Sequence, residues 1–286
     1  MPELPEVETI RLGLQKYLVG KRIERVEIRL PKLFEGDPRK ITGANIASVR
    51  RFGKALVIDL DPSTSSGQAF SLAVHVKMTG QLVYVGKDRP KESRISSKVG
   101  TVPNAFTHVI FHLSENAKLF YNDIRQFGWL KVLPTSEVEQ MKFISELGPE
   151  PFKDLTPEKF KEILRDKPTA IKVLLMDQKI LAGVGNIYAN DALYLSKINP
   201  KRGAKHITEE EAESLYEAIH TVLKKGLELG GSSEHTYVTA LGEEGAYQKH
   251  FLVYGKAGKA CTKCGSRIIR TTLGGRGTFF CEVCQV

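Results

Sequence analysis

Two cysteine pairs near the C-terminus, Cys261-Thr262-Lys263-Cys264 and Cys281-Glu282-Val283-Cys284, decide the fold of the last part of the chain. Sixteen residues separate the two pairs. This spacing is typical of a zinc ribbon, in which four thiolates surround one Zn²⁺ tetrahedrally. Two disulfides are the alternative, and a reducing compartment disfavours them. We therefore predict one structural Zn²⁺, with no open coordination position, held by Cys261, Cys264, Cys281 and Cys284.

The segment between the cysteine pairs contains Gly274-Gly275-Arg276-Gly277, which suits the tip of a hairpin between two strands. A segment of about 25 residues cannot bury enough apolar surface to fold alone, so its folding should depend on the metal. The hairpin should present Arg276 for binding a phosphate. A solvated surface arginine is the alternative.

Helical patterns precede the zinc ribbon. Thr156-Pro157-Glu158 is a helix start, 169–177 reads as a second helix, and 186–197 follows Gly183-Val184-Gly185. Thr208 and Glu211 form a capping box that opens a long helix ending at Gly230-Gly231. One face of this helix carries an apolar stripe that we assign to the core: Ala212, Leu215, Ile219, Val222 and Leu223.

The first half of the chain differs in character. A helix pattern from Pro5 to Leu18 precedes many short β-rich runs, whose number and spacing indicate a sandwich. The polar and basic stretch 86–104 is expected to be a mobile loop, and 230–247 is expected to be another loop. The predicted strands are 23–30, 46–49, 55–60, 71–76, 81–85, 108–113, 118–121 and 129–133, with turn material such as 61–67 between them.

These patterns predict a multidomain α+β protein with four parts. Residues 1–134 form an N-terminal β-sandwich flanked by helices, and 135–150 form a hinge linker. Residues 151–257 form a helical domain that ends in a loop, and 258–286 form the zinc finger.

The chain has 42 Lys and Arg against 33 Asp and Glu, a formal net charge of +9. This excess suits a polyanion such as nucleic acid, although charge alone does not separate that partner from a merely basic protein. No apolar run reaches membrane-spanning length, and the acidic, Pro-rich start does not look like a signal peptide. We expect an intracellular protein of the cytoplasm or nucleoid, not secreted and without a membrane partner. No oligomer interface is evident, so we expect a monomer.

Three separated stretches resemble one family. Met1-Pro2-Glu3-Leu4-Pro5-Glu6-Val7-Glu8-Thr9 is similar to the start of the formamidopyrimidine-DNA glycosylases. Leu181-Ala182-Gly183-Val184-Gly185-Asn186-Ile187-Tyr188-Ala189 is similar to their helix–two-turn–helix motif, and the four cysteines match their zinc finger. The resemblance spans the chain in the family's order. It implies that 1–134 is the catalytic domain and that 151–257 is a helix–two-turn–helix DNA-binding domain whose loop 230–247 caps the lesion. It implies a base-excision repair glycosylase and abasic-site lyase that removes oxidised purines, such as 8-oxoguanine and formamidopyrimidines, from duplex DNA.

The chemistry of the first stretch can also be derived from the residues. Removal of Met1 leaves Pro2 as a secondary amine, and an α-amino group has a pKa of about 8 rather than lysine's value of about 10.4. Such an amine can attack a sugar C1′ carbon and form an iminium that acts as an electron sink. Glu3 can shuttle protons if its surroundings exclude water, and Glu6 can orient Glu3 or the sugar. The alternative for all three acids is complementing the helix dipole, which we prefer for Glu8.

The resemblance implies further site residues. Lys54 is a phosphate contact and proton donor for the elimination, and Arg276 grips the phosphate at the lesion and serves the later elimination. Asn186 and Lys167 are phosphate contacts; the helix start after Gly-x-Gly offers free N–H groups to an anion. For Lys54, a solvated lysine at the head of a strand is the alternative.

A flipped-out base leaves a gap in the stack, which the family fills with three side chains. Here they correspond to Met78, Arg125 and Phe127, with core packing as the alternative for Met78 and Phe127. Arg125 would pair with the orphaned cytosine.

Two positions depart from the family's pattern. Gln126 replaces a second arginine, which puts one phosphate contact in doubt. Phe106 replaces the first histidine of a His-x-His pair, which puts a DNA-contacting histidine in doubt. The resemblance implies that His108 contacts DNA. No base-reading residue is assigned in the loop 230–247.

Two other functions stay open. A protein that binds damaged DNA without chemistry is disfavoured by intact Pro2, Glu3, Lys54 and Arg276. An endonuclease VIII-like enzyme for oxidised pyrimidines is disfavoured by Leu4 and by the pair Arg125 and Phe127.

Overall fold

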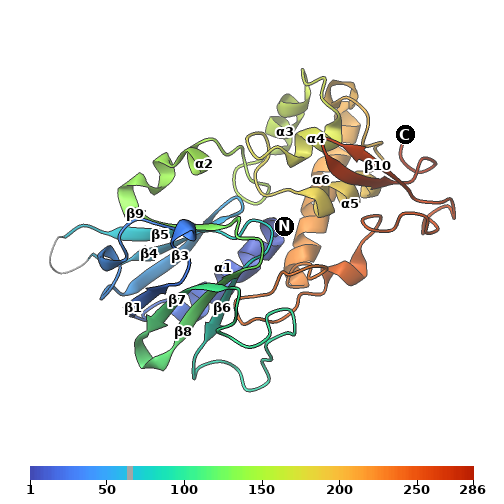
Figure 1. Cartoon of the computed structure of the whole chain (residues 1–286). Helices are drawn as coiled ribbons and strands as arrows, with labels where there is room; N and C mark the ends of the chain where they lie inside the picture. The colour runs from blue at the N-terminus through green and yellow to red at the C-terminus, as the bar shows by residue number, and fades with distance from the viewer. Residues whose placement is uncertain (63–66) are drawn as a thin grey trace. The chain divides into compact units, whose positions relative to one another are not determined.

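The computed structural model describes residues 1–62 and 67–286, which form two compact units (Figure 1). Unit 1 consists of Met1–Ser145 and Leu229–Gln248, and unit 2 consists of Glu146–Glu228 and Lys249–Val286. The predicted turn at 61–67 falls partly outside the described residues. Both helices and sheets are present, which confirms the predicted α+β class.

Unit 1 opens with helix α1 (Leu4–Leu18). Glu3 is its N-cap and Pro5 lies in its first turn, where a missing N–H costs no hydrogen bond. Val7, Ile10 and Leu14 are buried along one face, as their helical spacing predicts. The helix ends before Gly20, whose φ of +84° favours glycine.

Two sheets follow α1 in unit 1. All strand pairs are antiparallel except β2 with β9, which is parallel. Every predicted strand is present, with ends that differ by a few residues, whereas the short β2 and the 3-10 turns were not predicted. The five-stranded sheet has the order β2 (Phe34–Glu35), β9 (Trp129–Pro134), β5 (Phe70–His75), β4 (Ala55–Leu60), β3 (Ile46–Phe52). The four-stranded sheet has the order β1 (Ile23–Ile28), β7 (Thr107–Leu113), β8 (Lys118–Asp123), β6 (Gly80–Val85).

The 3-10 turns of the two units are η1 (Pro31–Leu33), η2 (Pro38–Lys40), η3 (Ser114–Asn116), η4 (Thr135–Gln140), η5 (Ala204–His206) and η6 (Tyr247–His250).

One apolar cluster joins the two sheets and α1. It includes Leu56 and Val74 of the five-stranded sheet, Leu82 and Phe111 of the four-stranded sheet, and Val7 of α1. Side chains alternate between the two faces of a strand, so one face of each sheet meets this shared core. The predicted β-sandwich is therefore confirmed.

Residues 135–145 cover the other face of the five-stranded sheet. They form η4 and the short helix α2 (Lys142–Ser145), whose Val138 and Ile144 pack with Val57, Ala73 and Leu133. Most of the predicted hinge 135–150 is thus packed into unit 1. Its apolar residues are spaced irregularly, which made the stretch resemble a linker.

Unit 2 contains four helices, α3 (Pro157–Leu164), α4 (Ile171–Met176), α5 (Asn186–Leu195) and α6 (Glu209–Glu228), and a hairpin of β10 (Ile269–Leu273) and β11 (Arg276–Phe280). The predicted capping box of α6 is present, since Thr208 N donates to Glu211 Oε2 at 2.9 Å and Glu211 N donates to Thr208 Oγ1 at 3.2 Å. The whole predicted stripe of α6 is buried. No helix in the part of the chain that the structure describes is long and apolar enough to span a bilayer.

Candidate functional site

The start of α1 is buried with its polar groups. Pro2 and Glu3 are both buried, and the Glu3 side chain is only 3% exposed. Glu3 and Glu6 form a capping box in which Glu3 N donates to Glu6 Oε2 at 2.8 Å. The water-excluding surroundings that a proton-shuttling Glu3 requires are therefore present.

The second oxygen of Glu6 holds a distant segment of unit 1. Ser232 N donates to Glu6 Oε1 at 2.7 Å, in the stretch 229–248 that was expected to cover a base. Burial, with the Glu6 charge beside it, holds the pKa of Tyr237 well above its usual range. One carboxylate thus joins the residue after Pro2 to this segment, a contact that the sequence did not reveal.

Ser232 was also missed by the sequence analysis. Its side-chain oxygen is buried and has no hydrogen-bond partner within the described residues. An unpaired buried hydroxyl costs free energy, so native proteins rarely leave one without a reason. A bound ligand with a polar edge would satisfy it.

Lys54 lies in the tight turn between β3 and β4. Phe52 pairs with Ala55, and Gly53 takes a φ of +54° between them. Lys54 is 3% exposed, so the solvated-lysine alternative is wrong. Burial, with the charges of Lys77 and Lys54, lowers the pKa of His75 to about 3. His75 is therefore neutral, and its Nδ1 accepts a hydrogen bond from Lys77 N at 2.9 Å.

Glu8 does more than complement the helix dipole. Its carboxylate accepts from Arg51 Nε at 2.7 Å and from Arg11 Nη2 at 2.7 Å. Arg51 Nη1 also donates to Gly53 O at 2.9 Å, in the turn that carries Lys54. These bonds attach the Lys54 turn to α1. The preference for a pure dipole role for Glu8 was wrong, because its partner lies 43 positions further along the chain.

A buried carboxylate shapes the loop that carries Arg125 and Phe127. Asp123 Oδ1 accepts from Arg125 N at 3.2 Å and from Thr79 Oγ1 at 2.5 Å, while Oδ2 accepts from Gly128 N at 2.8 Å. Thr79 directly follows Met78, so one side chain fixes both predicted gap-filling stretches. Asp123 is a positioning residue that sequence reasoning missed.

The three predicted gap-filling side chains reach the surface to different degrees. Phe127 is 55% exposed, which excludes core packing for it, and Met78 is half-buried. The Arg125 guanidinium is exposed and lies 4.6 Å from the centre of the Phe127 ring. An exposed arginine stacked on an exposed aromatic ring is unusual for a merely structural loop.

His108 is buried in β7, where its Nε2 donates to Asp123 O at 2.8 Å. It therefore supports the loop organised by Asp123. The contact of His108 with DNA stays a prediction. Phe106, two positions earlier, is exposed, and the loss of a DNA-contacting histidine at that position also stays a prediction.

In unit 2 the start of α5 has the predicted Gly-x-Gly geometry. Gly183 has a φ of +91°, and the side chain of Gln178 holds the turn by accepting from Gly183 N at 2.9 Å and donating to Val184 O at 2.8 Å. Asn186 is the first helical residue and is half-buried. Lys167 is exposed in the connection between α3 and α4.

The four cysteines form one cluster. Their sulfur atoms all lie within 4.8 Å of one another, with Cys261 and Cys284 3.8 Å apart and Cys264 and Cys281 3.5 Å apart. Zn–S bonds of about 2.3 Å place tetrahedral sulfurs about 3.8 Å apart. Disulfides need S–S distances of about 2.05 Å, so that alternative is wrong. The cluster fits one structural Zn²⁺, as predicted.

The zinc hairpin is also held from outside the metal site. Lys172 of α4 is fully buried and donates to Gly277 O at 2.8 Å and to Thr278 Oγ1 at 2.7 Å. The hairpin tip is Gly274-Gly275, with φ of +54° and +70°, so it is two residues long. Arg276 is the first residue of β11, exposed beside this tip. Lys172 was not singled out from the sequence.

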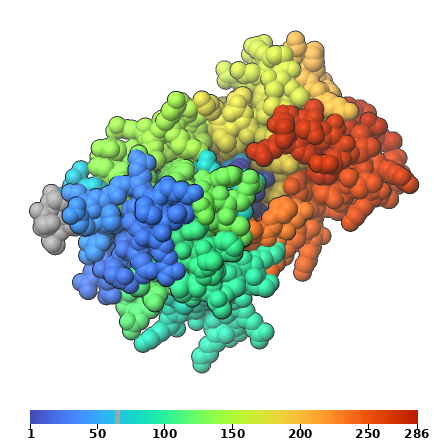
Figure 2. Space-filling view, in the orientation of Figure 1, coloured from blue at the N-terminus to red at the C-terminus, as the bar shows by residue number. Residues whose placement is uncertain are grey.

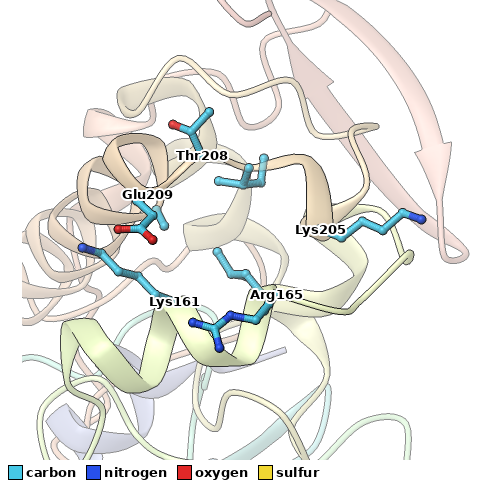
Figure 3. Close-up of a pocket in the computed structure, with 8 residues that line it drawn as sticks. Lys161, Arg165, Lys205, Thr208 and Glu209 are labelled. Carbon is cyan, nitrogen blue, oxygen red and sulfur yellow. The ribbon is translucent and has the colours of Figure 1, made fainter.

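A separate cavity of about 160 Å³ in unit 2 is lined by Lys161, Arg165, Lys205 and Glu209, among others (Figure 3). Figure 3 shows Lys161 and Glu209 pointing toward one another and Lys205 pointing away. Its basic groups do not converge on one point. None of the predicted site residues lines it, and we assign it no function.

Unit 1 therefore carries the buried Pro2 and Glu3, Lys54 and the Arg125 loop, and unit 2 carries Asn186, Arg276 and the zinc cluster. This combination defines a class of zinc-ribbon, helix–two-turn–helix proteins with a β-sandwich whose first helix follows a buried proline at position 2. Three family models match: the formamidopyrimidine-DNA glycosylase N-terminal domain at 1–130, its H2TH domain at 147–238, and the zinc finger found in FPG and IleRS at 258–286.

Full-length relatives agree with these models. Formamidopyrimidine-DNA glycosylases of Pelotomaculum thermopropionicum and Carboxydothermus hydrogenoformans are each 40% identical, covering 100% of this chain and 99% and 100% of theirs. Lactococcus lactis enzymes in complex with DNA containing Fapy-dG or an abasic site are each 34% identical, with a TM-score of 0.85 and 99% coverage of both chains. The chain belongs to the formamidopyrimidine-DNA glycosylase family.

The Glu8–Arg51 pair predicts an acid-sensitive contribution to stability. Burial raises the pKa of Glu8, but the bonds from Arg11 and Arg51 outweigh it and hold the pKa below its usual value. The contribution is present above the unfolded pKa of about 4.3 and is lost as the pH falls through the folded value. Replacing Arg51 by Gln should lower the free energy of unfolding by ~1–3 kcal/mol at pH 7 and flatten its decline in acid. Urea titrations from pH 3 to 7 measure this.

Arg11→Gln is the matched control for that series. Arg11 binds the same carboxylate but is more exposed and does not reach Gly53. Arg11→Gln should therefore lower the free energy of unfolding by less than Arg51→Gln does. An equal decrease in the free energy of unfolding for both variants at every pH would contradict the larger contribution of Arg51.

The cysteine cluster predicts one zinc ion per chain. Cys281→Ser should release it and unfold residues 258–286, because this segment has little core of its own. Metal analysis and amide hydrogen exchange over β10 and β11 check the result. Thr272→Ala, an exposed change in the same hairpin, should keep the zinc. An unchanged exchange pattern after complete metal loss would refute a folding role for the zinc.

Proposed function

We propose that this chain is a base-excision repair enzyme that removes oxidised purines, 8-oxoguanine and formamidopyrimidines, from duplex DNA and then cleaves the abasic strand. Pro2 is the nucleophile once Met1 has been removed. The observation that supports the proposal most is the buried, hydrogen-bonded start of α1, where Pro2 directly precedes Glu3 and Glu6 accepts a hydrogen bond from Glu3 N. The Lactococcus lactis relatives in complexes with Fapy-dG and abasic DNA support it.

The reaction begins with attack of the Pro2 nitrogen on the sugar C1′ carbon. The bond from C1′ to the base breaks, the base leaves with a proton, and ring opening gives an iminium between Pro2 and the sugar. The iminium acidifies the C2′ proton, whose loss expels the 3′ phosphate, and a second elimination expels the 5′ phosphate. Glu3 moves protons at the sugar, Glu6 holds the backbone of Glu3, and Lys54 and Arg276 bind phosphate and assist the eliminations.

Further contacts position the DNA. Lys167, Asn186 and Arg276 bind backbone phosphates, and a helix N-terminus such as that at Asn186 attracts an anion. Met78, Arg125 and Phe127 fill the gap left by the flipped base, and His108 contacts DNA. The Ser232 hydroxyl, which is buried and has no partner among the residues that the structure describes, would bind the polar edge of that base. The cysteine cluster, with Zn²⁺ bound, supplies no chemistry and holds the hairpin that presents Arg276.

The organisation and location follow the same proposal. Residues 1–134 act as the catalytic domain, 151–257 as the DNA-binding domain with its capping loop, and 258–286 as the zinc finger. Since 135–145 packs on the sheet of unit 1, only 146–150 of the predicted hinge 135–150 is left to serve as a linker. The capping stretch belongs structurally to unit 1. The protein works as an intracellular monomer on chromosomal DNA.

Arg125 should read the base opposite the lesion. Its donors meet the acceptors of an unpaired cytosine, whereas adenine presents a donor at the corresponding edge. Excision should favour lesions opposite cytosine, and Arg125→Ala should reduce that preference severalfold. Single-turnover rates on matched duplexes measure it, with Arg94→Ala, an exposed arginine of the same unit, as the control. A preference that survives Arg125→Ala would contradict the assignment.

The proposal requires a free Pro2 nitrogen. Protein shown by mass spectrometry to lack Met1 should cleave lesion duplexes, and borohydride added during turnover should fix protein to DNA. Protein that retains Met1 has this nitrogen in an amide, so it should bind DNA but neither cleave it nor become trapped. Robust cleavage by the Met1-retaining form would rule out Pro2 as the nucleophile. If Met1-free protein bound lesions but cleaved none of a purine and pyrimidine panel, the non-enzymatic alternative would hold.

A further inference from the structure

The polar stretch 86–104 is not the free loop that its sequence suggests. It contains no helix or strand, and Figures 1 and 2 show it beside the orange stretch 229–248 of the same unit. Hydrogen bonds join the two stretches. Arg89 Nη2 donates to Leu241 O at 2.8 Å, and Ser96 N donates to Gly242 O at 2.8 Å. We name 229–248 the capping segment and 86–104 the strap.

Lys98 of the strap contacts two residues of the capping segment. Its ammonium donates to Ser233 O and lies 3.0 Å from Glu244 Oε2. Ser96 Oγ donates to the other oxygen of Glu244 at 2.5 Å. Ser233 directly precedes the exposed residues Glu234 and His235, and ten residues separate it from Glu244 along the capping segment. Lys98 therefore clamps two separate parts of the capping segment together.

The clamp is backed by strand β6 and by apolar packing. Gln81 Nε2 donates to Thr236 O at 2.6 Å and to Lys98 O at 3.3 Å, which ties strap and capping segment to the same side chain. Val99 and Val238 are buried in one cluster with Val83. The packing therefore survives if the Lys98 charge alone is removed.

We propose that Lys98 is a specificity-determining positioning residue, which holds the Ser232–Ser233 backbone in the shape needed to cover a flipped base. This inference rests on the proposed function. Preorganised contacts raise affinity for a bound group by reducing the ordering that binding requires. An abasic site has no base to cover, so its cleavage does not need the cap.

The test compares two substrates with the charge-removing variant Lys98→Met. Single-turnover excision of a formamidopyrimidine should slow about 10- to 100-fold, since a lost charged hydrogen bond is worth roughly 1.5–3 kcal/mol. Cleavage of the same duplex carrying an abasic site should stay within about twofold. Lys98→Arg should restore most of the excision rate. Lys91→Met removes an equal charge from an exposed position of the strap and should leave both rates unchanged.

Two outcomes would overturn the inference. Equal slowing on both duplexes would assign Lys98 to general DNA binding or folding, and unchanged excision would deny it any role. Glu244→Gln provides a second variant of the same clamp should Lys98→Met fold poorly.

Amide hydrogen exchange without DNA tests the clamp independently of activity. Lys98→Met should raise exchange across 232–244 but not in α1, and unchanged exchange there would refute the clamp. If the wild-type protein excised no lesion, the proposed function would fail, while this measurement would still decide the positioning role.

Discussion

The start of α1 and the segment 229–248 depend on two hydrogen bonds that the Glu6 carboxylate accepts. One oxygen accepts from Glu3 N at 2.8 Å and the other from Ser232 N at 2.7 Å, and the side chain is 1% exposed. A buried carboxylate is stable only when its oxygens are well bonded, so both backbone segments are fixed together. The end of the chain that carries Pro2 and the segment expected to cover a flipped base therefore share one support. Removing that support would displace both at once.

The same design recurs around this support. Asp123 organises the stretches that carry Met78 and Arg125, Arg51 attaches the Lys54 turn to α1, and Lys98 clamps the capping segment. In each case a charged side chain holds backbone groups of a loop, and the residue expected to act on DNA lies next to it. Loops carry function when a rigid frame positions them. In unit 2, Lys172 and the zinc cluster provide that frame for Arg276.

Local patterns were enough to predict the elements of this fold. The cysteine spacing specified the zinc cluster, and the capping box at Thr208 and Glu211 located the start of α6. Alternating apolar residues located the strands to within a few residues, because burial of one face imposes that period. Residues 135–145 were missed as packed structure, since their apolar residues follow no regular period.

Long-range polar contacts were not predictable in the same way. Glu8 and Arg51 lie 43 positions apart, and Lys98 and Ser233 lie 135 apart, so nothing local links them. The resemblance named residues that are expected to act on DNA but not those that hold them in place. The central claim is that the nitrogen of Pro2, rather than Lys54, bonds to the sugar. Peptide mapping by mass spectrometry of the borohydride-fixed adduct tests it most directly: the account predicts DNA-derived mass on the peptide that begins at Pro2, and its presence on the peptide containing Lys54 would contradict it.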